Sequence, residues 1–158
     1  MIPRLLTSTI QRLAGGFPVV VLTGPRQSGK TTLVRDTFPD KPYVSLEAPD
    51  TRMLASVDPR GFLATYPDGA ILDEVQRVPD PLSYIQVIVD ENRSPGRFVL
   101  TGSQNFALNR QISQSLAGRA GIARLLPLSG TELRSAGLLP PVLDDWLFTG
   151  GYPALHST

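Results

Sequence analysis

The sequence predicts an α/β fold in which helices cover both faces of a five-stranded, mostly parallel sheet. Short apolar runs alternate along the chain with segments whose apolar residues recur at helical spacing, the pattern of repeated strand–helix units. The run at residues 19–22 is apolar at every position, as expected of a strand that is buried on both faces. With 158 residues, of which 41% are hydrophobic, the chain is long enough for one domain with a substantial core.

The strands and helices follow one another in a regular order. Strands are expected at residues 19–22, 43–46, 70–72, 98–100 and 122–128. Helices are expected over residues 6–13 (ended by Gly15 and Gly16), from Gly29 onward, as two short pieces within 49–67, over 80–89, over 108–116 (ended by Gly118), over 131–137 and over 144–148. In the helix over 80–89, Asp80 is expected to be the N-cap and Pro81 the first helical residue.

Composition excludes several classes of protein. Without cysteine the chain can form neither disulfides nor thiolate metal sites, and a reducing cytoplasm is the expected location. No run of 18 apolar residues is present, so no membrane contact is expected. The net charge of +1 does not favour a polyanionic partner. Only two of the fifteen basic residues are lysines, Lys30 and Lys41.

A phosphate-binding loop follows the first strand. Eight consecutive residues match the Walker A pattern G-x-x-x-x-G-K-[ST] at every fixed position: Gly24, Pro25, Arg26, Gln27, Ser28, Gly29, Lys30 and Thr31, with Thr32 next in the expected helix. The glycines allow backbone N–H groups to curl around one anion, and the helix N-terminus adds partial positive charge. Lys30 is expected to reach the β- and γ-phosphates of ATP, and the Thr31 hydroxyl to ligate Mg²⁺.

The third strand ends in two acidic residues, Asp73 and Glu74. The carboxyl ends of parallel strands face the same crevice, so these side chains should lie near the phosphate-binding loop. Asp73 fits the Walker B role of holding Mg²⁺, and Glu74 is then placed to activate a water molecule as a general base. An enzyme that transfers phosphate to a bound acceptor molecule does not need a base to activate water. The acidic pair therefore favours ATP hydrolysis over phosphotransfer. No Asn-Lys-x-Asp sequence is present to read guanine, which favours ATP over GTP.

The fourth strand ends in polar residues, and an arginine follows a helix further on. Ser103 is the first candidate to contact the γ-phosphate or the attacking water, and Thr101 the second; a plain turn is the alternative for both. Arg119 could stabilise charge on the γ-phosphate in the transition state, or it could be a structural residue at a helix end.

The assembled motifs resemble a known family. They are the loop at 24–33, Leu-Asp-Glu-Val-Gln-Arg-Val-Pro at 72–79, Leu-Thr-Gly-Ser-Gln at 100–104, Ser-Leu-Ala-Gly-Arg at 115–119, Leu-Pro-Leu-Ser at 126–129 and Gly-Gly-Tyr-Pro at 150–153. In this order they are similar to the prokaryotic AAA+-like ATPases whose C-terminal half is a domain of unknown function.

The resemblance implies a P-loop NTPase sandwich of three layers with sheet order 5-1-4-3-2. It also implies that Ser103 or a neighbour is the sensor residue of the fourth strand, and that Arg119 is an arginine finger or a structural arginine. Similar proteins continue beyond the ATPase core. We therefore expect a core over residues 1–137, followed at 138–158 by the start of a helical segment that is truncated here.

Three functions are consistent with the sequence. The first is a Mg²⁺-dependent ATPase module that couples nucleotide state to a partner, either further copies of the chain or an unknown protein. The second is an ATP-binding switch or scaffold without significant hydrolysis. The third and least favoured is a small phosphotransferase. The resemblance leaves DNA binding open, but the charge of the chain gives it no support.

Overall fold

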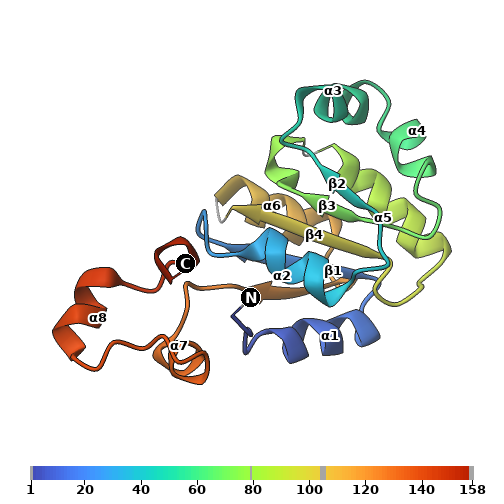
Figure 1. Ribbon diagram of the computed structural model, residues 1–158. Helices are drawn as coiled ribbons and strands as arrows, with labels where there is room; N and C mark the ends of the chain where they lie inside the picture. The colour runs from blue at the N-terminus through green and yellow to red at the C-terminus, as the bar shows by residue number, and fades with distance from the viewer. Residues whose placement is uncertain (1, 79, 104–105, 157–158) are drawn as a thin grey trace.

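A computed structural model describes residues 2–78, 80–103 and 106–156 (Figure 1). In chain order the elements are α1 (Thr7–Gly16), β1 (Val19–Gly24), α2 (Lys30–Thr37), β2 (Tyr43–Ser45), α3 (Pro49–Val57), α4 (Pro59–Ala64), β3 (Ile71–Asp73), η1 (Val75–Arg77), α5 (Pro81–Glu91), β4 (Phe98–Ser103), α6 (Phe106–Ser115), β5 (Ala120–Arg124), α7 (Gly130–Ser135), α8 (Leu143–Thr149) and η2 (Pro153–His156).

The five strands form one sheet of order β2-β3-β4-β1-β5, in which every pair of neighbours is parallel. This is the 5-1-4-3-2 order read from the other edge, so both the α/β class and the predicted order are confirmed. The interior strand β1 pairs with β4 on one side and β5 on the other. Its six residues are all buried, as the continuous apolar run at its start predicts.

The core lies in two layers, one on each face of the sheet. Alternate residues of β1 divide between them: Val19 and Val21 face one layer, Val20 and Leu22 the other. Side chains of α4, α5 and α6 fill the first layer, and side chains of α1 and α2 fill the second. Helices therefore cover both faces of the sheet, which gives the predicted three-layer arrangement (Figure 1).

Because the strands are parallel, the loops that follow β1, β3 and β4 all lie at the carboxyl ends of the strands. The carboxyl ends of β1, β3 and β4 are Gly24, Asp73 and Ser103, and β4 lies between the other two strands. In an open α/β sheet, ligands bind in the crevice beyond these carboxyl ends. The sheet order thus gathers the loop after β1 and the acidic pair after β3 at one place.

Two of the sequence predictions need correction. Pro81 is the first residue of α5 and Asp80 stands at the N-cap position, as predicted, but the Asp80 backbone is already helical (φ −57°, ψ −39°) and its side chain makes no capping hydrogen bond. The fifth strand covers residues 120–124 and not 122–128. Beyond Leu125 the chain turns away from β1, and the Leu128 N–H donates to the Gly151 carbonyl at 2.6 Å instead.

The segment after β5 forms α7, α8 and η2, which lie to one side of the sheet (Figure 1). Leu133 of α7 is buried, whereas α8 has no buried residue. Among the helices within the described ranges, none combines the length and the apolar character needed to cross a bilayer.

Candidate active site

The loop between β1 and α2 has the backbone that an anion cradle requires. Gly24 and Gly29 have positive φ angles of 156° and 92°, and Gln27 is also left-handed at 61°. A Cβ atom on Gly24 would collide with the carbonyl oxygen of Leu125, so only glycine fits there. Ser28 is buried and its hydroxyl donates to the Pro25 carbonyl at 2.9 Å, which closes the loop on itself. Arg26, Gln27 and Thr32 are exposed.

Lys30 points into this loop. Its side chain is 4% exposed, and its ammonium group donates to the carbonyl oxygens of Pro25 at 2.9 Å and Gly24 at 3.3 Å. Burial lowers the pKa of Lys30 below its usual value, while the nearby carboxylates of Glu74 and Asp73 act in the opposite direction. A cation is thus held within the loop, with both predicted acidic residues close enough to affect its titration.

Asp73 is the meeting point of three hydroxyl groups. Its Oδ2 accepts from Thr31 at 2.9 Å and from Tyr43 at 2.7 Å, and its Oδ1 accepts from Thr101. Burial and the hydrogen bond to Asp73 raise the pKa of Tyr43 to about 12, so its hydroxyl is protonated and donates at neutral pH. The predicted Walker A threonine and Walker B aspartate are therefore in direct contact.

The donor atoms at this point fit a magnesium ion. Thr31 and Asp73 supply an oxygen each, and hard oxygen ligands are those that Mg²⁺ prefers. Within the described ranges, His, Cys, Asp and Glu side chains form no cluster of three or more that could hold a metal by themselves. The residues present thus suit an ion that also takes ligands from a bound phosphate and water, as Mg²⁺ does in nucleotide sites.

Glu74 and Ser103 are brought together by a third residue, Gln76. The Ser103 hydroxyl lies 3.4 Å from Glu74 Oε2, and the Gln76 carboxamide contacts both residues. Glu74 has a left-handed backbone (φ 62°, ψ 45°), which is uncommon for a residue other than glycine. Such backbone strain often occurs at functional sites. Gln104, the last residue of the polar tip, lies outside the described residues.

Arg119 does not lie at this site. It precedes β5, and its carbonyl oxygen accepts from the N–H of Val19 at the start of β1. Arg119 therefore lies at the amino ends of the strands, whereas the phosphate-binding loop lies at their carboxyl ends. Its guanidinium binds both carboxylate oxygens of Asp90, at 2.6 and 2.8 Å, and also donates to the Ala117 carbonyl. Of the two roles considered, this geometry supports a structural one within the chain.

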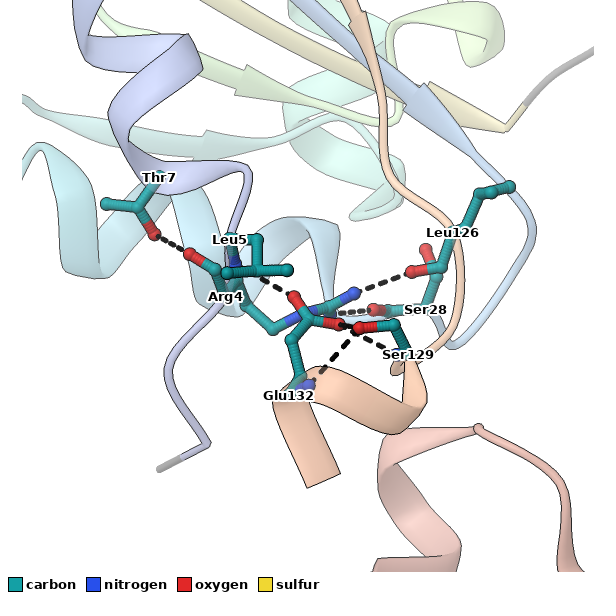
Figure 2. A network of polar contacts seen from close by, with 7 residues as sticks. All are labelled: Arg4, Leu5, Thr7, Ser28, Leu126, Ser129 and Glu132. Atoms are coloured by element: carbon teal, nitrogen blue, oxygen red, sulfur yellow. Dashed lines mark hydrogen bonds and ion pairs between the residues drawn. The ribbon is translucent and has the colours of Figure 1, made fainter. Parts of the chain in front are cut away.

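A network around Arg4 joins the phosphate-binding loop to the C-terminal part of the chain (Figure 2). The guanidinium donates to the Ser28 carbonyl at 2.8 Å, to the Leu126 carbonyl at 2.6 Å and to Glu132 Oε1 at 3.0 Å. Arg4 and Glu132 are only 9% and 7% exposed. Glu132 also completes a capping box with Ser129 at the start of α7. One arginine thus contacts the loop, the exit of β5 and α7.

Sequence reasoning missed Tyr43, Gln76, Arg4 and Glu132. The pattern Ser-x-x-Glu at 129–132 is a capping-box signature and could have located the start of α7 at Gly130. Tyr43 and Arg4 contact residues that lie far apart from them in the sequence, and no local pattern indicates those contacts. Gln76 belongs to the motif at 72–79, but its contact with Ser103 spans 27 residues.

Two curated relatives match most of the chain. They are the uncharacterized proteins Mb2031c of Mycobacterium bovis and Rv2008c of Mycobacterium tuberculosis, each 39% identical over 147 residues. The match covers 91% of this chain and 32% of either relative. The chain therefore spans about a third of the length of these relatives.

Solved structures share the fold at low sequence identity. The Walker-type ATPase PABY2304 of Pyrococcus abyssi has a TM-score of 0.58 and 16% identity, and the match covers 97% of this chain and 65% of that one. AMPPCP-bound DnaA from Aquifex aeolicus has a TM-score of 0.59 and 14% identity, covering 96% and 56%. Residues 16–134 match the AAA domain family, and that stretch contains β1 through β5 together with the loop and the acidic pair. The chain belongs to the AAA domain family.

Proposed function

We propose that this chain binds ATP with Mg²⁺ and hydrolyses it. The observation that carries the proposal is the direct contact between Thr31 and Asp73 beside the buried ammonium of Lys30. In this assignment the residues from Gly24 to Thr32 surround the phosphates. Thr31 and Asp73 hold the ion, which supplies charge neutralisation at the phosphates when bound.

Glu74 is the proposed general base. Glu74 directly follows Asp73, the last residue of β3, and its carboxylate is close enough to Lys30 to oppose the lowering of that lysine's pKa by burial. A carboxylate next to the γ-phosphate can orient water and accept its proton. Ser103, on the neighbouring strand β4, is within 3.4 Å of that carboxylate and is the proposed sensor of the γ-phosphate.

The proposal extends to coupling. Through Arg4, the phosphate-binding loop is connected to α7 and so to the segment that follows the sheet. We propose that this connection transmits nucleotide state to a partner, either another copy of the chain or a different protein. A cytoplasmic location fits the absence of cysteine from the sequence.

A nucleotide-dependent switch without turnover is the second candidate. The observation in its favour is the position of Arg119, which is bound to Asp90 away from the site and so is not placed to stabilise charge on a γ-phosphate within the same chain. A transition-state arginine contributes about 10³–10⁵ in rate where one is present.

An ATPase assay under single-turnover conditions separates the two candidates. With Mg²⁺, the wild-type chain should hydrolyse ATP, and Glu74→Gln should lower the rate by about 10²-fold or more while ATP affinity stays near wild type. Removal of Mg²⁺ by a chelator should abolish turnover. Equal rates for wild type and Glu74→Gln would exclude Glu74 as the base, and no turnover with intact binding would establish the switch.

A further inference from the structure

The Gln76 side chain bridges the ends of two strands at the proposed catalytic site. Its Nε2 donates to Glu74 Oε2 and, at 3.4 Å, to the Ser103 hydroxyl oxygen. Its Oε1 accepts from the Ser103 backbone N–H at 3.3 Å. One carboxamide therefore holds the residue after β3 and the last residue of β4 at the same time.

The chemistry of the partners fixes the orientation of this amide. A backbone N–H can only donate, so it must face Oε1, and an ionised carboxylate can only accept, so it must face Nε2. A flipped amide would lose both contacts. The carboxamide has a donor and an acceptor at the required ends, and neither an apolar nor an acidic side chain of the same length has both.

The surrounding chain leaves room for Gln76 and fixes its backbone. Gly102 lies beside the carboxamide: a Cβ there would be 2.7 Å from Gln76 Oε1 and 2.6 Å from a methyl group of Leu108. Val75 is buried and anchors the short helix η1, while the left-handed backbone of Glu74 turns the chain so that the side chains of residues 74 and 76 meet.

We propose that Gln76 is a positioning residue that holds the Glu74 carboxylate against Ser103. It acts on the attacking water only through Glu74, and it links the proposed base to the proposed γ-phosphate sensor. The inference rests on the proposed function, because it deepens the role of Glu74 in ATP hydrolysis. Contact with Ser103 would let a change at the end of β4 alter the position of the base.

A double-mutant cycle tests this role. Gln76→Met keeps the length of the side chain and removes its hydrogen bonds, and Gln86→Met makes the same change on α5 as a control. Under single-turnover conditions Gln76→Met should lower the rate of ATP hydrolysis by about 10-fold or more, with the Kd for Mg-ATP changed by less than about 2-fold. In the Glu74→Gln background the same substitution should have almost no further effect, because the two residues act as a unit.

A second measurement does not depend on turnover. The side-chain amide resonances of Gln76 in a ¹H–¹⁵N spectrum should shift on Glu74→Gln and on Ser103→Ala, and should stay unchanged on Ser113→Ala, a control on α6. These spectra test the contacts of Gln76 with Glu74 and Ser103 whether or not the wild-type chain hydrolyses ATP. A chain that does not hydrolyse ATP would contradict the proposed hydrolysis but not these contacts.

Three results would overturn the inference. One is a wild-type rate in Gln76→Met. Another is an equal loss of rate from Gln76→Met in the wild-type and Glu74→Gln backgrounds, which would mean that Gln76 acts independently of Glu74. The third is an unchanged chemical shift of the Gln76 side-chain amide in both Glu74→Gln and Ser103→Ala.

Discussion

Asp73 occupies a buried position at the end of β3, where hydroxyl groups from three different elements converge on its carboxylate. They belong to Thr31 of α2, Tyr43 of β2 and Thr101 of β4. Hydrogen bonds of this kind fix the direction of a metal-binding oxygen. The arrangement suits a metal-binding carboxylate whose two oxygens must keep fixed orientations.

Asp73→Asn should therefore weaken the dependence of nucleotide binding on Mg²⁺. The amide keeps one oxygen and the shape of the side chain, but it removes the negative charge that a divalent ion requires. Titration of a fluorescent ATP analogue with and without Mg²⁺ measures the effect, which should be about 10-fold or more in the affinity of the Mg²⁺ complex. Asp36→Asn, an exposed carboxylate on α2, is the matched control. An unchanged Mg²⁺ dependence in Asp73→Asn would remove Asp73 from the metal site.

At the scale of residues, the sequence predicts those parts of the site that are local in the chain. The loop from Gly24 to Thr31 is eight consecutive residues, so its pattern can be recognised without any knowledge of the fold. Contacts made across the sheet cannot be recognised in this way, because their partners are far apart in the chain: Tyr43 and Asp73 are 30 residues apart, and Gln76 and Ser103 are 27 apart. Such pairs depend on strand register and side-chain direction, which a single sequence does not provide.

At the scale of elements, one buried carboxylate connects α7 to the N-terminal segment. Glu132 accepts from the N–H groups of Ser129 and Leu5 and from the guanidinium of Arg4 (Figure 2). Burial alone would raise the pKa of Glu132, but these hydrogen bonds and the positive charge outweigh it and lower the pKa below 4.5. The carboxylate is thus stabilised in the folded state.

This lowered pKa makes a prediction about acid stability. The folded state binds fewer protons at Glu132 than the unfolded chain, so the stabilisation is complete above about pH 4.5 and is lost as the pH falls through the lower folded pKa. Glu132→Gln should reduce the free energy of unfolding at pH 7 by about 1–3 kcal/mol, with a smaller difference from wild type at acid pH. Chemical denaturation between pH 7 and pH 3 measures it, with the exposed Glu47→Gln as control. Parallel pH profiles for wild type and Glu132→Gln would contradict the role of the network.

The C-terminal end of β5 is a feature that the sequence alone does not predict. The apolar residues Leu125, Leu126 and Leu128 extend the pattern of β5, which explains why the strand was predicted to reach residue 128. Only the first of the three continues the pairing with β1, through its N–H to the Thr23 carbonyl. The end of β5 is set by the length of β1 and by a backbone contact with Gly151, and both are tertiary features.

At the scale of the whole molecule, the two-layered core and the C-terminal segment differ in burial. Both faces of the sheet are covered by buried apolar side chains. Within the C-terminal segment, Leu133 of α7 is fully buried. In α8, by contrast, Phe148 is 95% exposed. The stability of the fold should therefore depend on the sheet layers and α7, and very little on the outer face of α8.

Phe148→Asp should leave the free energy of unfolding within about 0.5 kcal/mol of wild type, as is usual for an exposed position. Leu133→Ala, made in the same C-terminal segment, should lower it by about 2–5 kcal/mol because it removes a buried side chain. Thermal unfolding of the two variants beside wild type checks both values. A large loss of stability in Phe148→Asp would mean that α8 packs against the core more closely than its exposure indicates.

The central claim is that Lys30 and its loop bind the phosphates of Mg-ATP, and nucleotide-dependent thermal unfolding tests it most directly. At a ligand concentration of 100 times Kd, the wild-type chain should gain about 2.7 kcal/mol, or a rise of several degrees in Tm. Lys30→Ala should lose this gain, whereas Lys41→Ala, which changes the other lysine of the chain, should keep it. An equal rise in Tm for wild type and Lys30→Ala would contradict the account.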